Sequence, residues 1–292
     1  MCASSKTTTG RKPFFPYALP GLLYRLTRAA RPVSEALADY VGLIYREGFR
    51  VDADSLLRHA NLHSFLFSHL DASQLETGLM AERSRLGLAA DFSAGFDAYG
   101  TETVARDKAF ARIRRSSRKL VRDKGGIECA LHNVYDQNMM DMLIHQKIDQ
   151  YHRTQVGNPL KTAQVRQFLH ELARLPGTET CSPVFSTLRC DDTIIASHFG
   201  LRCGANLHYW LPVYNPDYAH YSPGHILLWE MIRQASAAGI HSIDFGEGDT
   251  PAKRKFANRE HAYFLGFYAR KTPQGLTDRA RMAFSWRIMQ MR

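Results

Sequence analysis

The stretch YNPDYAHYSPGHILLWEMIRQASAAGIHSIDFGEGDTPAKRKF, residues 214–256, decides the fold. It predicts a loop, a helix, a strand, a turn and a second helix. Ser222 is a favourable N-cap residue, and Pro223 suits the first helical position, where its missing N–H has no intrahelical acceptor to lose. Apolar residues follow at helical spacing, and Gly239 is the expected C′ residue that ends the helix.

The start of this helix is a candidate anion site. A polar, glycine-containing loop that leads into a helix favours negative charge, because free N–H groups and the helix dipole both point outward there. Residues 241–245 then predict a short strand that ends at the polar turn 246–249. An ordinary capped helix beside a strand is the alternative interpretation.

An antiparallel meander precedes this stretch. Three strands are predicted at residues 184–190, 193–202 and 206–213, joined by a turn at 191–192 and a three-residue turn at 203–205. With that second turn, Gly200 lies opposite His208, and His198 lies opposite Trp210. One sheet face then carries polar, aromatic and ionisable residues, namely His198, Gly200, Arg202, Asn206, His208 and Trp210. Two histidines and a tryptophan on one face favour substrate binding and proton transfer over a merely solvated face, although a one-residue slip would divide the set.

The remaining segments complete the expected order. We expect a strand at residues 40–45, a helix at 53–59 capped by Asp52, and a strand at 62–70. Helices are expected at 106–124, 136–154 and 162–175, and a last strand at 262–270. Residues 1–21 resemble a loose lead-in, and the first part of the chain holds few strands for its length.

Composition limits the class of protein. The chain has 292 residues, 45% of them hydrophobic and 23% charged, which is typical of a globular protein. No apolar run reaches the length of about 18 residues that spans a bilayer. Five cysteines, odd in number and without metal-ligand spacing, argue against a disulfide framework and a zinc site. We therefore expect no transmembrane segment, no metal and a cytoplasmic location.

The net charge of +10 suggests an anionic partner without choosing one. Residues 106–124 carry nine of the cations in nineteen positions. A phosphate or RNA contact is one interpretation of this segment. A solvated connecting helix is favoured, because no aromatic residues interleave the cations to stack on bases, so nucleic acid is not the expected partner.

The order of strands and helices is that of a GNAT acyltransferase core, and four motifs make the resemblance closer. SHFGLR (197–202), LHYWLPVYNPDY (207–218), YSPGHILLWEMI (221–232) and IDFGEGDTPAKRKF (243–256) resemble the CelD/BcsL type of acetyltransferase. That family is linked to bacterial cellulose and exopolysaccharide biosynthesis and is related to the FemAB aminoacyl transferases. A weaker match extends upstream over RPVSEALADYVGLI, residues 31–44.

The resemblance implies an α+β fold, GNAT-like, with tandem halves around mixed, mostly antiparallel sheets. Residues 1–105 would be an incomplete first half, 106–124 a basic connecting helix, and 125–292 the acyltransferase domain. It also implies acetyl-CoA or another acyl-CoA as co-substrate and a sugar or similar small-molecule acceptor, with polysaccharide synthase components as partners. One departure concerns Ala252, where the family's Gly-x-x-Pro-Tyr-Lys pattern has tyrosine. If that tyrosine protonates the thiolate in relatives, this chain needs another acid.

The resemblance carries roles onto individual residues. His198 would be the general base, with Asp244 near the acceptor and Tyr214 as a hydroxyl donor. His208, Trp210 and Lys253 would bind the acceptor or an anionic group. The CoA site would comprise Tyr221, Ser222, Pro223, Gly224 and His225. In the GNAT fold the pantetheine lies between the splayed fourth and fifth strands, and backbone N–H groups beside the splayed strand would stabilise the oxyanion.

Two other functions remain open. A FemAB-like transferase would take its aminoacyl group from charged tRNA, and the basic segment 106–124 motivates it. A non-catalytic accessory protein of a polysaccharide synthase is motivated by Ala252, the short first half and the basic stretch 279–292, which suggests binding to a membrane surface or a partner.

Overall fold

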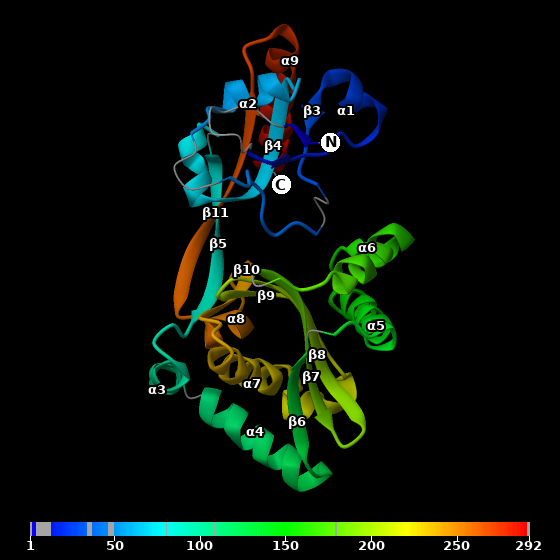
Figure 1. The fold of residues 1–292 in the computed structure, drawn as a ribbon, viewed down its shortest axis with the longest axis vertical. Coiled ribbons are helices and arrows are strands. Elements are labelled where there is room, and N and C mark those ends of the chain that lie inside the picture. The colour runs from blue at the N-terminus through cyan, green and yellow to red at the C-terminus, as the bar shows by residue number, and fades with distance from the viewer. Residues whose placement is uncertain are drawn as a thin grey trace. The chain divides into compact units, whose positions relative to one another are not determined.

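The structure is a computed structural model that describes residues 2–3, 13–33, 37–45, 50–79, 81–107, 109–132, 134–178 and 180–290. The chain forms two compact units (Figure 1). Unit 1 comprises Met1–Leu86 with His261–Arg292, and unit 2 comprises Gly87–Glu260. The boundaries expected for the sequence halves, at 105/106 and 124/125, stay a prediction. The compact units describe a different property, the clustering of contacts, and they divide the chain at 86/87 and 260/261.

Unit 1 is built around strand β4. Its elements are β1 (Cys2–Ala3), β2 (Phe15–Pro16), α1 (Gly21–Thr27), β3 (Ala29–Ala30), α2 (Ala53–His59), β4 (Ser64–Asp71), η1 (Ala72–Thr77) and α9 (Pro273–Gln290), with most of β11 (Arg259–Ala269). β4 pairs with β3 in parallel and with β11 antiparallel. Phe65 and Phe67, two positions apart on β4, are buried with Leu70 in a core that includes Phe15 and Leu57.

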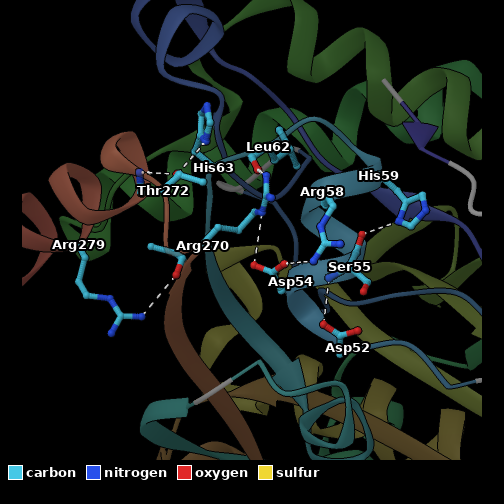
Figure 2. A network of polar contacts seen from close by, with 12 residues as sticks. Asp52, Asp54, Ser55, Arg58, His59, Leu62, His63, Arg270, Thr272 and Arg279 are labelled. Atoms are coloured by element: carbon cyan, nitrogen blue, oxygen red, sulfur yellow. Dashed lines mark hydrogen bonds and ion pairs between the residues drawn. The ribbon is translucent and has the colours of Figure 1, made fainter.

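A polar network joins α2 to the end of β11 (Figure 2). Asp54 accepts a 2.6 Å hydrogen bond from Arg58 and lies 3.4 Å from Arg270 Nε. The guanidinium of Arg270 also donates to the carbonyl oxygen of Leu62. Because the guanidinium groups of Arg58 and Arg270 share one carboxylate, they hold the pKa of Asp54 below its usual value.

Two predictions in unit 1 are confirmed and one is wrong. Asp52 caps α2 by accepting from Ser55 N–H at 2.9 Å, and β4 lies where 62–70 was expected. The expected strand at 40–45 is absent from these residues, which make only isolated bridges at Val41 and Ile44. Residues 1 and 4–12 of the expected lead-in, 34–36 of the weak upstream match, and 291–292 of the tail lie outside the described residues.

Unit 2 is a mixed sheet covered by helices. Its helices are α3 (Phe96–Arg106), α4 (Ala109–Lys124), α5 (Gln137–Thr154), η2 (Pro159–Lys161), α6 (Ala163–Arg174), η3 (Pro216–Tyr221), α7 (Pro223–Ala237) and α8 (Pro251–Phe256). Its strands follow the order β5 (Ala81–Asp91, of which residues 87–91 belong to this unit), β10 (Ser242–Glu247), β9 (Asn206–Tyr214), β8 (Thr193–Cys203), β7 (Cys181–Cys190) and β6 (Ile127–His132). β10 pairs with β9 in parallel, and its other neighbour β5 is antiparallel.

Helices lie on both faces of this sheet. α5 contacts β8 and β9 and α6 contacts β7, while α7 packs on β6, β7 and β8 with α4 outside it (Figure 1). α7 buries Ile226, Leu227, Met231 and Ile232 at helical spacing. Pro223 occupies the first turn and Gly239 has φ +73°, so the expected start and end of this helix are confirmed.

Ser222 differs from the expected cap. It has φ +57° and ψ +51°, and its side chain makes no capping hydrogen bond. The residue ends the 3₁₀ helix η3, and the turn from η3 into α7 needs this left-handed conformation rather than the extended one of an ordinary N-cap. The expected helix at 106–124 is also shorter, because α3 ends at Arg106 and α4 begins at Ala109.

The register of β8 and β9 corrects the expected one. The connecting loop has two residues, Gly204 and Ala205, so Cys203 lies opposite Asn206. Gly204 has φ +59°, which a tight two-residue turn requires and glycine adopts readily. A bulge then adds one residue to β9, so His198 lies opposite Pro212 and not Trp210.

Candidate functional site

The parallel ladder between β9 and β10 is short. It joins Asn206 to Ser242, Leu207 to Ile243 and His208 to Asp244, and it extends no further. β9 continues to Tyr214 and β10 to Glu247, so beyond His208 the two strands no longer pair with each other. Beyond that point the facing edge of β9 is not bonded to β10.

His208 and Asp244 lie at the end of this ladder. Nδ1 of His208 is 4.0 Å from Oδ2 of Asp244, and their side chains are 15% and 13% exposed. The other carboxylate oxygen of Asp244 accepts a 2.8 Å hydrogen bond from Gly246 N–H, which fixes its orientation. A partly exposed imidazole can take a proton from an acceptor, and the oriented carboxylate beside it can stabilise the positive charge that the imidazole then carries.

His198 lies inside the unit, with no exposed surface. Its ring stacks on Tyr209 with centroids 4.6 Å apart, and its Nδ1 is 3.4 Å from Ser186 Oγ. Burial, and secondly the nearby His208, lowers the pKa of His198 to about 3, so the ring is neutral at physiological pH. This burial argues against the expected role as general base, and the more exposed His208 suits that role better.

Gly200 makes this arrangement possible. A Cβ at this position would lie 2.0 Å from the carbonyl oxygen of His208 and 2.7 Å from Nε2 of His198. No side chain fits there, so His198 and the bulged part of β9 depend on a glycine between them. The sequence placed Gly200 on the polar face but gave no sign of this close approach.

Lys147 is a buried cation beside β9 that the sequence pattern did not single out. It belongs to α5, is 7% exposed, and donates from Nζ to the carbonyl oxygen of Pro212 at 3.1 Å. Burial lowers its pKa to about 8. The signal was available, because Lys147 falls four residues after Leu143 and four before Tyr151, on the apolar side of the expected helix.

The start of α7 has few free donors. The carbonyl oxygen of Ser222 accepts from the N–H groups of His225 and Ile226, at 3.0 and 3.2 Å, and Pro223 has no N–H. Gly224 therefore carries the first-turn N–H that has no intrahelical acceptor. A Cβ on Gly224 would lie 3.7 Å from Cδ1 of Tyr214, so the end of β9 borders this turn.

The flanking residues of that turn are engaged elsewhere. Tyr221 is 4% exposed, and its hydroxyl donates to Asp123 at 3.2 Å, which raises its pKa together with burial as the larger cause. His225 packs on Phe256 with ring centroids 5.8 Å apart, and burial lowers its pKa to about 4. Tyr221 and His225 thus help to hold the turn in place through their contacts with Asp123 and Phe256.

Only some of the residues expected to bind the acceptor lie close together. Trp210 lies beside His208, with ring centroids 6.5 Å apart, so these two and Asp244 come together. Lys253 turns back to the end of β10, where Nζ donates to the carbonyl oxygen of Glu247 at 2.6 Å. Tyr214 is 39% exposed and borders Gly224 instead.

The described residues contain no group of three or more histidines, cysteines or acidic residues placed to hold a metal ion. Within the same residues, no helix has the length and apolar character to cross a bilayer.

Comparison with known proteins gives a family and a fold. Residues 107–254, about half of the 292-residue chain, match the model of the Acetyltransferase (GNAT) domain. No curated protein matches the sequence. The C-terminal domain of a candidate lysylphosphatidylglycerol synthetase from Agrobacterium fabrum has a TM-score of 0.59 at 14% identity, covering 94% of this chain and 86% of that one. FemX has a TM-score of 0.56 at 11% identity, covering 95% and 90%. At these identities the likeness concerns the fold, and it agrees with the expected GNAT-like α+β class.

Proposed function

Because the chain belongs to the GNAT acetyltransferase family, we propose that this acyltransferase moves an acetyl group from acetyl-CoA to an amine or hydroxyl of a sugar or polysaccharide precursor. The observation that carries the proposal is the His208–Asp244 pair at the end of the β9–β10 ladder. The proposal takes His208 as the general base, because it lies where the two parallel strands stop pairing and a thioester would have room alongside β9. The resemblance of residues 197–256 to the CelD/BcsL type supports the acceptor class.

In the proposed reaction, His208 removes the proton from the acceptor nitrogen or oxygen as that atom attacks the thioester carbon. Asp244 orients the imidazole and stabilises its positive charge. The new bond to the acyl carbon forms, the carbonyl electrons move to oxygen, and their return breaks the carbon–sulfur bond. The CoA thiolate then takes the proton that His208 removed from the acceptor, so the imidazole returns to its neutral form and no separate acid is needed for the tyrosine absent at Ala252.

The donor is proposed to bind with its pyrophosphate at the first turn of α7. Gly224 contributes the free N–H, and the absence of a side chain there leaves room for the phosphates. His225 and Tyr221 support the turn from the protein side rather than through direct bonds to phosphate. Trp210 offers an aromatic face for a sugar ring beside His208.

The experiment that tests this function is an incubation of the purified chain with acetyl-CoA and a panel of amino sugars and nucleotide sugars. Products are followed by mass spectrometry and by release of CoA. We expect acetylation of at least one sugar, lost in the His208→Ala variant. Acetyl-CoA that stays intact with every acceptor, in a folded chain, would contradict the proposal.

A second candidate is an aminoacyl transfer from charged tRNA, and α4 favours it. The helix carries seven exposed cations, namely Arg112, Arg114, Arg115, Arg118, Lys119, Arg122 and Lys124, with Asp123 as its acid. Its apolar side, Phe110, Ile113 and Leu120, is buried, so the basic side faces solvent. Phosphate contacts weaken steeply with salt, so tRNA binding that is tight at 50 mM salt and falls at least tenfold at about 200 mM, without affinity for acetyl-CoA, would favour this candidate.

A further inference from the structure

Lys147 is a buried cation without a carboxylate nearby. Its ammonium group donates to one carbonyl oxygen, that of Pro212, and lies 5.3 Å from the ring centroid of Tyr151. Within the described residues, no aspartate or glutamate oxygen lies within 4.0 Å of it. A lysine side chain has three donors, and a buried ammonium is stable only when an anion or several acceptors face it.

The carbonyl of Pro212 locates this ammonium at the open edge of β9. Asn215 N–H donates to the carbonyl oxygen of Ile195, so these two residues form a hydrogen-bonded pair of the antiparallel ladder. From this pair on, hydrogen-bonded and non-hydrogen-bonded pairs alternate along β8 and β9. Pro212, opposite His198, falls between the bonded pairs, as a residue without N–H must. Its carbonyl therefore points away from β8, toward the edge where β10 no longer pairs with β9.

The edge of β9 lacks one backbone N–H donor, that of residue 212, at a place where the proposed reaction needs a donor. In the proposed reaction, the thioester oxygen becomes negative beside β9, and backbone N–H groups of that strand would stabilise it. At Pro212 the strand has no N–H to offer, and the ammonium of Lys147 sits on the same residue. The other ionisable groups facing Lys147 are His198 from β8, which is neutral, and Tyr151 from its own helix.

We propose that Lys147 Nζ binds the oxyanion that forms on the thioester carbonyl during acyl transfer. The inference rests on the proposed function and adds a catalytic residue to it. As the acceptor atom bonds to the acyl carbon, the carbonyl electrons move onto oxygen, and the ammonium donates a hydrogen bond to that oxygen without losing its proton. When the carbonyl re-forms, the carbon–sulfur bond breaks and the thiolate leaves.

The proposal predicts a separation of binding from turnover. Acetyl-CoA binding is measured by calorimetry, and acetyl-CoA consumption, with water as the acceptor, is measured by chromatography of released CoA. In Lys147→Met we expect a Kd within threefold of wild type, a rate constant lowered about 100- to 1,000-fold, and an unchanged or higher melting temperature. Lys161→Met, which removes an exposed lysine, is the matched control and should match wild type.

The pH profile gives a readout that a structural lysine would not move. The wild-type rate should fall as pH rises through about 8, where Lys147 loses its proton, and Lys147→Arg should shift this fall to higher pH. In addition, the ¹³Cε resonance of Lys147 should shift when acetyl-CoA binds, which needs no turnover.

Three results would overturn the proposal. Equal rates in wild type and Lys147→Met would remove Lys147 from the reaction, as would a ¹³Cε resonance that acetyl-CoA leaves in place. A loss of rate that follows a loss of folded protein would make the residue structural. A wild-type chain that binds no acetyl-CoA would instead contradict the proposed function itself, and the inference would fall with it.

Discussion

Nδ1 of His208 lies 4.0 Å from Oδ2 of Asp244, across the last paired residues of β9 and β10. Each of these strands has another neighbour, β8 or β5, that anchors it up to this point. The pair is therefore held rigidly at the place where the strands stop pairing with each other. A base in this position meets the thioester and the acceptor together in the proposed reaction.

Asp244→Asn should lower turnover and leave the fold intact. The amide oxygen can still accept from Gly246 N–H, but it cannot stabilise the charged imidazole of His208. We expect kcat to fall about 10- to 100-fold, with KM for acetyl-CoA within threefold, in steady-state assays. Asp249→Asn is the control, because Asp249 pairs with Arg254 at the surface. Full activity in Asp244→Asn would remove the carboxylate from the mechanism.

Gly200→Ala should destabilise unit 2. The added Cβ would meet the carbonyl oxygen of His208 at 2.0 Å, so β8 and β9 would have to separate. We expect a loss of about 2–4 kcal/mol in the free energy of unfolding by urea titration, as for other overpacked cores. Gly126→Ala, where nothing lies within 4 Å of the new Cβ, should change stability far less. Comparable stability of the two variants would contradict the close approach at Gly200.

His198 should make stability depend on acid pH. Its pKa is about 3 in the fold and near 6.5 when unfolded, so between these values the unfolded chain binds the extra proton. The contribution of neutral His198 to the free energy of unfolding is then fully present above pH 6.5. It decreases as pH falls, by about 2 kcal/mol at pH 5. Urea titrations at pH 7 and 5 should show a smaller loss in His198→Leu than in wild type. An equal loss in both would mean that another group carries the acid sensitivity.

Local signals predicted most of unit 2. Pro223 and Gly239 marked the ends of α7, and apolar residues at helical spacing marked α5 and α6, because such signals act over only a few residues of the chain. The strands of the meander followed from alternating apolar residues and turn signals for the same reason. The two-residue turn at Gly204 could equally have had three residues, and only the pairing of β8 with β9 decides between them.

Long-range relationships could not be predicted from the sequence. The two-residue turn and the bulge in β9 each shift the register by one residue, and together they set Pro212 opposite His198. His198 and His208 looked equivalent on one face, but stacking on Tyr209 buries the first and leaves the second partly exposed. Lys147 was visible on the apolar side of its helix, yet its contact with Pro212 joins residues 65 positions apart.

In the proposed function, the first turn of α7 binds the donor. The measurement that tests it most directly is a calorimetric titration of acetyl-CoA into the wild-type chain, Gly224→Glu and Gly157→Glu. Gly224 has room for a side chain near Tyr214, so the first variant should fold while its carboxylate repels the phosphates. Gly157 lies in an exposed loop with nothing within 4 Å, which makes it the matched control.

We predict binding by wild type and Gly157→Glu, and at least tenfold weaker binding by Gly224→Glu. Equal binding by all three folded chains would contradict the assignment of the donor site. No binding by any of them would contradict acetyl-CoA as the donor.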